Sequence, residues 1–477
     1  MKLVGVILAA GLGKRMNSSR PKVLHKIYDV PMLQYVLDRL NELNPQKVIV
    51  VVGKHFKEIR DAVRYGDSIS FIQQKEPKGT GDALLKTNQA LKGFRGTVLV
   101  INGDTPLIRR ETLKRFLSLH KQKMNVISVL SFTAQDPSFY GRVMRDPYKR
   151  ATSIIEDRDA TDKQKGIKEV NSGIYAIESE AIPILKEIRL NESKGEYYLT
   201  DVVSIARDKG IKVDAFCIGF EDELMGVNTQ GEMEKVRQIM RERIVHGWLN
   251  KGVNFMDAGS VFISPNVKIG KGTQIYPNVC LEGNTRVGKG CTIYPNVRIL
   301  SSIIGAESVI KDSTLIENSV VKKRASVGPF ARIRPGSQIG EAAEIGNFVE
   351  VKKSIIGTGT KAGHLSYLGD SKIGSNVNIG AGTITCNYDG YKKYITIIED
   401  DVFVGSDSQL IAPVKVGRGA FIGAGSTITE DVPSMALALS RVEQRNLRNW
   451  VTKRQLKVKS ERSKERKAKG RERRVKN

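Results

Sequence analysis

Aliphatic residues recur every six positions through much of the second half of this 477-residue chain. A period of six matches neither an amphipathic helix nor a two-sided strand. It fits a chain that turns a corner every six residues and sends one aliphatic side chain per turn into a narrow triangular core. The residues that keep this period are Ile269, Ile275, Leu281, Val287, Ile293, Ile299, Val327, Ile333, Ile339, Ile345, Val351, Ile398, Val404, Leu410, Val416, Ile422 and Ile428. The pattern predicts a hexapeptide-repeat solenoid, a left-handed parallel β-helix, over about 251–436.

The first half of the chain has a different pattern, in which short apolar runs alternate with amphipathic stretches. Apolar runs at 4–10, 47–52, 96–101 and 126–132 predict strands, and the stretches 32–42 and 110–120 predict helices. This alternation is typical of an α/β, Rossmann-like sheet with ligand loops at the carboxyl ends of its strands. We therefore expect an α/β domain at 1–228, a charged linker helix at 229–250, the β-helix domain at 251–452 and a basic tail at 453–477.

Composition and charge indicate a cytoplasmic protein with a basic end. No apolar run is long enough to span a membrane, and four scattered cysteines show no metal-binding spacing, which suits a reducing compartment. The net charge is +26, and the tail from 453 holds 13 Lys or Arg against 3 Glu. Such a tail is expected to be largely disordered, or helical only in part. It could bind nucleic acid or a membrane surface, but the absence of interleaved aromatic residues favours a solvated extension.

A glycine-rich turn follows the first predicted strand. Its backbone N–H groups can point at a phosphate, because glycine allows close approach. The turn comprises Ala10, Gly11, Leu12 and Gly13, and the nearby positive charges are Lys14, Arg15 and Lys22. The stretch matches neither the Rossmann nor the P-loop fingerprint, so a tight turn with surface charge remains an alternative.

A longer set of motifs is more specific. The chain contains Leu8-Ala-Ala-Gly-Leu-Gly-Lys-Arg-Met, Arg20-Pro-Lys-Val-Leu-His, Gly79-Thr-Gly-Asp-Ala, Asn102-Gly-Asp-Thr-Pro, Tyr140-Gly-Arg, Asn171-Ser-Gly and Gly195-Glu-Tyr-Tyr-Leu-Thr-Asp. In this order they resemble the sugar-phosphate nucleotidylyltransferases. With the solenoid attached, the chain from Val4 to about Arg441 is similar to the bacterial family that joins an N-acetylglucosamine-1-phosphate uridylyltransferase to a glucosamine-1-phosphate N-acetyltransferase.

For the N-terminal domain this resemblance implies uridylyl transfer, in which a sugar-1-phosphate oxygen attacks the α-phosphorus of UTP and pyrophosphate leaves. It implies that Mg²⁺, which prefers oxygen ligands, is held by Asp104 and Asn228. Arg15 and Lys22 would hold the phosphates and act in catalysis. Contacts to UTP or the UDP-sugar are implied for Leu8, Ala9, Ala10, Gly11, Lys22, Gln74, Gly79, Thr80, Asn102, Gly141, Glu156, Asn171, Thr200 and Asn228. Within this set, Gln74, Gly79 and Thr80 would hold the uracil, and Gly141, Glu156, Asn171 and Thr200 would contact the sugar.

Two positions depart from the pattern of this family. Asn102 stands where an aromatic residue often precedes Gly-Asp, and Pro77 stands where a glutamine often follows the uracil-binding Gln74. Both changes concern the details of nucleotide binding, and neither alters the predicted reaction.

The solenoid carries one of the five histidines, His364. A single histidine is more often structural than catalytic, but this one has polar segments around it in sequence. Acetylation of an amino sugar needs a base, and histidine titrates near neutral pH. Glu350 is the candidate carboxylate to orient the ring, while Arg334 and Lys352 suit a sugar phosphate. An insertion at 386–394 interrupts the period, and loops that leave a regular solenoid tend to carry function.

The same resemblance extends to this second site. It implies glucosamine-phosphate contacts for Arg334, Lys352, Tyr367, Asn378 and Lys393. It implies that His364 is the catalytic base and that Asn387 also takes part in catalysis. The implied acetyl-CoA contacts are Ala381, Asn387, Tyr388, Ser406, Ala424 and Arg441. It further implies a homotrimer with acetyl sites built from neighbouring chains.

The function predicted from these motifs is therefore the synthesis of UDP-N-acetylglucosamine from glucosamine-1-phosphate, acetyl-CoA and UTP in two steps. One alternative is a single-activity nucleotidylyltransferase whose solenoid is structural or regulatory. A second is a nucleic-acid-binding protein that uses the basic tail, although this would leave both sets of motifs unexplained.

Overall fold

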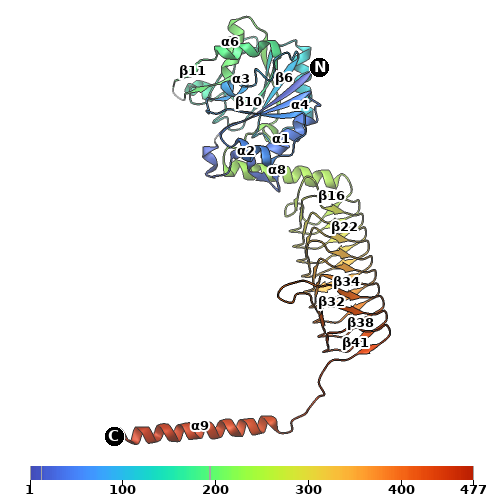
Figure 1. The fold of residues 1–477 in the computed structure, drawn as a ribbon. Helices are drawn as coiled ribbons and strands as arrows, with labels where there is room; N and C mark the ends of the chain where they lie inside the picture. Colours follow the sequence, from blue (N-terminus) through green and yellow to red (C-terminus); the bar gives the residue numbers. More distant parts are fainter. Residues whose placement is uncertain (1, 12, 193–194, 476–477) are drawn as a thin grey trace. The chain divides into compact units, whose positions relative to one another are not determined.

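The computed structural model describes residues 2–11, 13–192 and 195–475, and Leu12 of the glycine-rich turn lies outside them. The chain divides into two compact units, residues 1–342 and 343–477. The first holds an α/β domain, a long helix and the first coils of a solenoid. The second holds further coils and a C-terminal helix (Figure 1).

A mixed sheet forms the centre of the α/β domain. Its main path runs β13-β7-β10-β6-β1-β4-β5, with β10 antiparallel to both of its neighbours. The strands are β1 (Leu3–Ala9), β4 (Lys47–Val52), β5 (Ile69–Gln73), β6 (Thr97–Asn102), β7 (Ile127–Thr133), β8 (Arg142–Arg145), β9 (Ala151–Ile155), β10 (Glu169–Glu178) and β13 (Val213–Gly219). All seven residues of β1 are buried. Such an unbroken apolar run is typical of a parallel strand that is covered on both faces.

Helices cover both faces of this sheet. Alternate residues of β1 enter two separate cores, with Ile7 on the side of α1 and α4, and Val6 on the side of α3 and α6. The helices are α1 (Met32–Asn41), α2 (Phe56–Ala62), α3 (Thr80–Leu85), α4 (Arg110–Gln122), α5 (Asp162–Lys165), α6 (Val202–Asp208) and α7 (Glu221–Leu224), with 3-10 helices η1 (Lys14–Met16), η2 (Lys22–Leu24), η3 (Ser179–Glu187) and η4 (Leu199–Asp201). The remaining short strands are β2 (Lys26–Ile27), β3 (Val30–Pro31), β11 (Leu190–Asn191) and β12 (Glu196–Tyr197).

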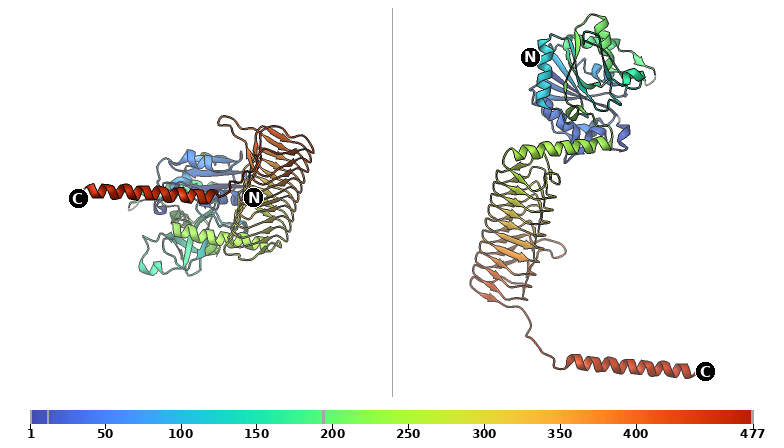
Figure 2. Two further views of the ribbon diagram at one scale, coloured as in Figure 1. Left: turned by 90° about the horizontal axis from the view of Figure 1, so that it is seen from below. Right: turned by 180° about the vertical axis from the view of Figure 1, so that it is seen from behind.

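A charged helix, α8 (Gln230–Leu249), follows the α/β domain where the linker helix is expected (Figure 2). It begins with a capping box, in which Thr229 accepts a hydrogen bond from the backbone of Glu232 and the Glu232 carboxylate accepts one from the backbone of Thr229. Met233 and Val236 enter a small core with residues that include Met32 and Val227. This packing fixes the start of α8 against the α/β domain.

The first unit also contains parallel β-helix coils with three faces. The first face has β14 (Asn254–Phe255), β17 (Gln274–Ile275), β20 (Thr292–Ile293), β23 (Val309–Ile310) and β26 (Ser326–Val327). The second face has β15 (Phe262–Ile263), β18 (Cys280–Glu282), β21 (Arg298–Leu300), β24 (Leu315–Glu317) and β27 (Arg332–Ile333). The third face has β16 (Lys268–Ile269), β19 (Arg286–Val287), β22 (Ile303–Ile304), β25 (Val320–Val321) and β28 (Gln338–Ile339).

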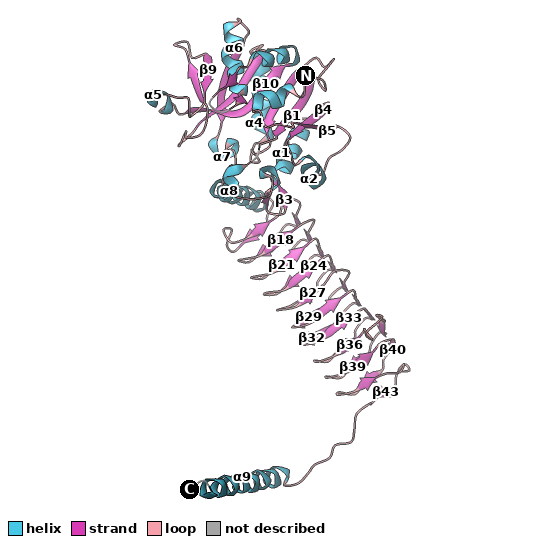
Figure 3. Ribbon diagram, turned by 60° about the vertical axis from the view of Figure 1, so that its left-hand side comes forward, coloured by secondary structure: helices cyan, strands magenta, loops and turns pink. Residues whose placement is uncertain are grey.

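The second unit has the same three faces, and successive strands stack along each of them (Figure 3). The first face has β29 (Glu344–Asn347), β32 (Lys361–His364), β35 (Asn378–Ile379), β38 (Phe403–Val404), β41 (Phe421–Ile422) and β43 (Leu437–Ala438). The second face has β30 (Glu350–Lys352), β33 (Tyr367–Gly369), β36 (Ile384–Cys386), β39 (Gln409–Ile411) and β42 (Thr427–Ile428). The third face has β31 (Ile355–Ile356), β34 (Ser371–Ile373), β37 (Thr396–Ile398) and β40 (Val414–Val416).

The interruption of the six-residue period after Ile299 has a simple cause. Ile299 and Ile304 are both buried, so one side of this coil is five residues long. The coil is then 17 residues long, as in the pairing of Ile293 with Ile310, whereas Ile275 pairs with Ile293 at a spacing of 18. The core is continuous here although the period is not.

The basic tail forms a helix, α9 (Trp450–Val475), where sequence analysis expects a largely disordered or partly helical segment. Lys, Arg, Glu and Gln have high helix propensity, which explains regular structure without an apolar face. Residues 450–465 are exposed along their whole length. None of the helices in the described part of the chain is long and apolar enough to cross a membrane.

Candidate active sites

A cavity of about 750 Å³ opens at the carboxyl ends of the central strands of the α/β domain. Ala10 and Gly11 follow β1, Gln74 follows β5, and Asp104 follows β6. This is where ligands bind in open α/β sheets, because loops from neighbouring strands meet there. The predicted residues that line the cavity are Leu8, Ala9, Ala10, Gly11, Arg15, Lys22, Gln74, Gly79, Thr80, Asn102, Asp104 and Glu156.

Two of the oxygens predicted to bind a metal converge on one cation. The Lys22 ammonium forms an ion pair with the Asp104 carboxylate and lies 3.0 Å from the Asn228 Oδ1 atom. The backbone N–H of Val227 donates to the carbonyl of Asp104 at 3.0 Å, so the two segments are joined. The Glu232 carboxylate of the α8 capping box accepts a hydrogen bond from the backbone N–H of Asn228 at 2.6 Å. The start of α8 therefore positions one of the two predicted ligands.

This donor set fits Mg²⁺. Asp104 and Asn228 supply hard oxygen atoms, and the Lys22 ammonium occupies the point between them as a bound cation would. Magnesium usually takes one or two protein ligands and completes its shell with water and substrate phosphates. In the described residues no group of three or more His, Cys, Asp or Glu side chains forms a metal site. A small oxygen site of this kind does not require such a group.

The residues predicted to hold the uracil are fixed by hydrogen bonds and by backbone conformation. Gln74 is buried, and its Nε2 atom donates to the Gly79 carbonyl at 3.1 Å and to the Asp82 carboxylate at 2.7 Å. Gly79 has a φ of +95°, and a Cβ atom there would lie 2.6 Å from the carbonyl of Tyr197, so only glycine fits. The Thr80 hydroxyl accepts a hydrogen bond from the backbone of Leu199 at 3.1 Å.

The residues predicted to contact the sugar lie together. Thr200 donates to the Glu156 carboxylate at 3.1 Å, and the backbone of Asn171 donates to the Gly141 carbonyl at 2.8 Å. Asn171 also donates from its side chain to the Tyr175 hydroxyl at 3.0 Å. Asn171 lies at a bulge in β10. The structure thus brings all four predicted sugar contacts to one side of the domain.

Asn102 packs against this bulge. Gly173 has a φ of +75°, and a Cβ atom there would collide with the Asn102 side-chain amide. The side chain that departs from the family pattern therefore lies directly on a glycine that follows the predicted sugar contact Asn171. The other departure, Pro77, also lines the cavity.

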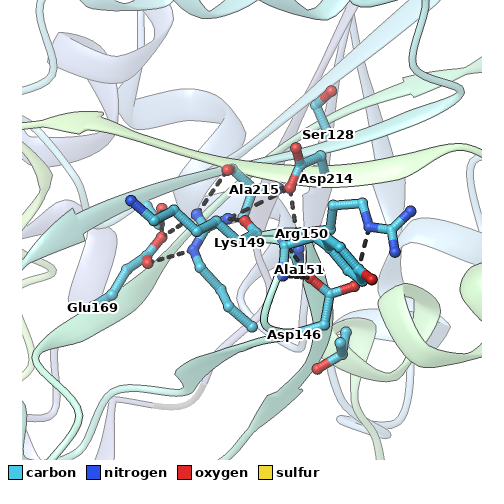
Figure 4. Close-up of polar contacts among 12 residues, drawn as sticks. Ser128, Asp146, Lys149, Arg150, Ala151, Glu169, Asp214 and Ala215 are labelled. Atoms are coloured by element: carbon cyan, nitrogen blue, oxygen red, sulfur yellow. Dashed lines mark hydrogen bonds and ion pairs between the residues drawn. The ribbon is translucent and has the colours of Figure 1, made fainter.

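A polar network supports the β8–β9 hairpin that lies between Gly141 and Glu156 (Figure 4). Arg145 donates to Glu169 at 2.6 Å and to the carbonyl of Ala215 at 2.8 Å. Hydrogen bonds from Arg207 and Arg150 lower the pKa of Asp146 to about 2. The carboxylate is therefore ionised at neutral pH and ties the hairpin to α6 through Arg207.

In the second unit, His364 lies at the end of β32 and is exposed. It pairs in register with Asn347 of the preceding coil, and its Nδ1 atom lies 2.5 Å from the Asn347 Oδ1 atom. An amide oxygen accepts a hydrogen bond, so this contact selects the tautomer with hydrogen on Nδ1. The Nε2 atom then carries the lone pair that a general base uses. Asn347 is the side chain that the structure places on Nδ1, and the predicted role of Glu350 in orienting the ring stays a prediction.

A charged cluster lies on the neighbouring face. Asp370 accepts a hydrogen bond from Asn387, and its carboxylate lies 3.7 Å from the Lys352 ammonium. Lys393 of the inserted loop also contacts Lys352, and this contact with a second ammonium group lowers the pKa of Lys393. Two amines at one point create a local positive charge that would attract a dianion such as a sugar phosphate.

The predicted acetyl-CoA contacts lie mainly along one corner of successive coils. The backbone of Asp407 donates to the Ala381 carbonyl at 2.7 Å, and the backbone of Gly425 donates to the Ser406 carbonyl at 2.8 Å. Arg441 donates to the Ala424 carbonyl at 3.0 Å. Ala381, Ser406, Ala424 and Arg441 therefore form a continuous column.

The other predicted residues of this site have defined places. Tyr388 is exposed in the inserted loop and forms a backbone bridge with Lys393. Tyr367 pairs in register with Glu350, and Asn378 begins β35. Arg334 follows β27 and belongs to the first unit, where its carbonyl accepts a hydrogen bond from Ser337 at 2.7 Å.

Sequence reasoning missed several polar residues at both sites. Asp82 lies inside the Gly79-Thr-Gly-Asp-Ala motif and Asn347 lies three residues before Glu350, but the motifs predict no role for either. Asp370 was missed because it follows a strand by one residue and has no motif of its own. Phe139 was also missed, although the Arg15 guanidinium lies 5.7 Å from the centre of its ring. Asn347 and Asp370 contact their partners in neighbouring coils, and spacing along the sequence does not show which residues these coils bring together.

We expect Asp370→Asn to weaken acetyl transfer, because the neutral amide no longer pairs with Lys352 and Asn387. Hydrogen bonds to charged groups contribute about 1.5–3 kcal/mol, so kcat/KM for glucosamine-1-phosphate should fall by roughly tenfold or more. Steady-state kinetics of thiol release checks this result. Uridylyl transfer and the melting temperature should be unchanged, and an equal loss of both activities would contradict the assignment.

Models of known protein families match the N-terminal and the C-terminal parts of the chain separately. A family model described as a MobA-like NTP transferase domain matches residues 5–167. A model of the GMPPB C-terminal domain matches 258–335, and one of the bacterial transferase hexapeptide, with six repeats, matches 395–430. A nucleotidyltransferase domain and hexapeptide repeats therefore occur in one chain.

Relatives described as the bifunctional protein GlmU match nearly the whole chain. The one from Thermodesulfovibrio yellowstonii is 51% identical over 449 residues, which cover 94% of this chain and 98% of the relative. The chain belongs to the bifunctional GlmU family. The relative from Syntrophotalea carbinolica is 46% identical, with 94% and 97% of the two chains covered. The relative from Halalkalibacterium halodurans is 44% identical, with 94% and 98% covered.

Membership of the GlmU family confirms the predicted fold class and the predicted pair of activities. The chain is a bifunctional uridylyltransferase and acetyltransferase of UDP-N-acetylglucosamine synthesis. The alternative of a single-activity nucleotidylyltransferase with a structural solenoid is therefore not supported.

Proposed function

We propose that each activity has its own site, with the residues assigned above. The N-terminal cavity transfers uridylyl groups, and the coils around His364 transfer acetyl groups. The observation that carries this proposal is the presence of two separate polar clusters: Lys22, Asp104 and Asn228 in one, and Lys352, Asp370 and Asn387 in the other. Each cluster lies among the residues that sequence analysis assigned to it.

In uridylyl transfer the chain mainly positions the reactants and offsets negative charge. Ala10 and Gly11 offer their backbone to the phosphates of UTP, and Arg15 and Lys22 supply positive charge. Gln74, Gly79 and Thr80 hold the uracil, while Glu156, Asn171 and Thr200 hold the sugar. The sugar-phosphate oxygen then attacks the α-phosphorus, and pyrophosphate departs.

Asp104 and Asn228 would hold Mg²⁺, which supplies charge neutralisation on the phosphates when bound. Lys22 contacts both side chains through its ammonium group. Entry of a divalent cation therefore requires this ammonium group to move, and the triphosphate is the anion to which it would move. The site thus couples release of Lys22 to arrival of UTP.

In acetyl transfer the amine of glucosamine-1-phosphate attacks the thioester carbon of acetyl-CoA and His364 removes a proton from this amine. The carbon–sulfur bond then breaks, and coenzyme A leaves as the free thiol. The hydrogen bond of His364 with Asn347 leaves Nε2 able to accept the proton of the amine. Lys352 and Lys393 hold the sugar phosphate together with Tyr367 and Asn378, and the resemblance implies a contact from Arg334 as well. Acetyl-CoA lies along the column of Ala381, Ser406, Ala424 and Arg441, next to Asn387 and Tyr388. Asn387 is the donor for the developing oxyanion.

The acetylated sugar phosphate is the acceptor in the uridylyl step, so acetyl transfer comes first. We propose that three copies of the chain assemble around their solenoids, as the resemblance implies. An exposed apolar column on the first face, Phe403, Phe421 and Leu437, supports contact with a second copy. The four cysteines are free, which agrees with a cytoplasmic location.

Chelation tests the separation of the two sites. We expect EDTA to stop pyrophosphate release from UTP and N-acetylglucosamine-1-phosphate, because Asp104 and Asn228 then have no cation to present to the phosphates. Thiol release from acetyl-CoA and glucosamine-1-phosphate should continue at an unchanged rate. Loss of both activities, with restoration of both by Mg²⁺, would contradict the two-site proposal.

A further inference from the structure

A second cavity, of about 430 Å³, lies beside the turn that carries Lys22 and is distinct from the substrate cavity. It forms within the first unit, between the 20–28 segment, α8 and the first coil of the solenoid. Its lining residues are Arg20, His25, Lys26, Tyr28, Glu234, Arg237, Gln238, Arg241 and Phe262. Neither predicted active site uses any of these side chains.

The charge of this cavity is strongly positive. Arg20, Lys26, Arg237 and Arg241 contribute four cationic groups, and Glu234 is the one carboxylate among the lining residues. Glu234 lies 3.6 Å from Arg237 and offsets part of that charge. Three positive charges remain without a carboxylate in the lining. The fold holds them against their mutual repulsion, and an anion would relieve that repulsion.

His25 points to a ligand independently of the net charge. Its Nε2 atom is buried and has no hydrogen-bond partner among the described residues. Burial lowers the pKa of His25, and a hydrogen bond with the backbone of Arg20 fixes the ring. Buried polar atoms are almost always paired in native proteins. The neutral ring that donates to Arg20 has a lone pair on Nε2, so this atom fits a ligand that donates a hydrogen bond to it, as the hydroxyl of a hydrogen phosphate does.

From this geometry we propose that the cavity is a second anion site that binds phosphate groups. Guanidinium groups bind phosphate with two parallel hydrogen bonds, and the cavity brings two of them, Arg237 and Arg241, from one face of α8. Tyr28 and Phe262, which meet edge to face at 6.4 Å, form an apolar wall beside them. The ligand class is a small phosphorylated anion, for which inorganic pyrophosphate is the simplest probe.

The site shares a turn with the catalytic machinery. The backbone of His25 donates to the Lys22 carbonyl at 3.2 Å, and that of Leu24 donates to the Pro21 carbonyl at 2.9 Å. Lys22 faces the substrate cavity, whereas Arg20 and His25 face the second cavity. An anion held by Arg20 and His25 therefore restrains the turn that positions Lys22. Occupancy acts on uridylyl transfer and leaves acetyl transfer unchanged.

Calorimetric titration of the full chain with pyrophosphate, in EDTA to prevent reaction, tests this proposal. We expect Arg237→Gln/Arg241→Gln and Lys22→Ala each to bind one pyrophosphate fewer per chain than the wild type does, at different sites. Lys235→Gln, which removes a charge from α8 outside the cavity, is the matched control and should bind as many as the wild type. An equal number of sites in Arg237→Gln/Arg241→Gln and in the wild type would overturn the proposal.

A second variant covers the case in which the double substitution disturbs folding. Arg20 is exposed, so Arg20→Gln removes one cationic group without altering packing. It should weaken the second site by roughly tenfold, as expected for loss of one charged hydrogen bond, and should not change the first. Acetyl transfer at the wild-type rate verifies that the chain is folded. Unchanged affinity at both sites in this folded variant would also overturn the proposal.

Discussion

Replacement of His364 by alanine should abolish acetyl transfer and leave uridylyl transfer intact. The imidazole is the proposed base for the attacking amine, and the contribution of such a group is typically 10²–10⁴-fold. We therefore expect kcat for thiol release to fall by at least about 100-fold. The KM for acetyl-CoA should change little, because the proposed acetyl-CoA column does not include His364.

Two further variants, one a control and one at the residue that orients the imidazole, make this test more specific. His55→Ala removes another partly exposed imidazole, on the α/β domain, and should leave both activities unchanged. Asn347→Ala should lower acetyl transfer less than His364→Ala does, because it frees the ring to rotate but keeps the base. If His364→Ala retained acetyl transfer at the rate of the His55 variant, the assignment of the base would be wrong.

Replacement of Asp104 by alanine should have the opposite effect. The carboxylate is the one charged oxygen donor at the proposed magnesium site, and its loss also leaves the Lys22 ammonium without its partner. Changes next to metal ligands typically cost 10–100-fold, so loss of a ligand itself should lower uridylyl transfer by at least about 100-fold. Pyrophosphate release measures this effect, and thiol release should be unchanged.

Two further variants show whether the effect of Asp104→Ala is specific. Asp208→Ala removes an exposed carboxylate from α6 and should be silent in both assays. Asn228→Ala removes the second oxygen donor and should raise the Mg²⁺ concentration needed for half-maximal rate. If Asp104→Ala retained uridylyl transfer at the level of Asp208→Ala, the proposed metal site would be incorrect.

The solenoid illustrates what a sequence period can predict. Residues such as Ile275, Ile293 and Val404 are buried, as a six-residue repeat requires. The buried residues Ile304, Ile316 and Val321 were not predicted, because five-residue sides shift the count while the core continues. The period indicates the architecture, whereas the exact register depends on how each corner is built.

In the α/β domain, too, the sequence predicts some features of the site and not others. The glycine-rich turn, Gln74 and Asp104 could be placed in one cavity from sequence, because loops at the carboxyl ends of strands meet at one edge. The sequence did not predict that β10 runs antiparallel or that Asn102 contacts Gly173. Both features depend on pairing between strands that are distant in sequence. Asp370 was missed for the same reason, as its partners Lys352 and Asn387 belong to other coils.

The most direct test of the two-site account supplies the purified chain with glucosamine-1-phosphate, acetyl-CoA, UTP and Mg²⁺, and follows free thiol and pyrophosphate together. The account predicts that thiol appears first and that pyrophosphate follows after a lag, as the acetylated product accumulates. Omission of acetyl-CoA should prevent both signals. Pyrophosphate release from added N-acetylglucosamine-1-phosphate, without thiol release from glucosamine-1-phosphate, would contradict it and reduce the solenoid to a scaffold.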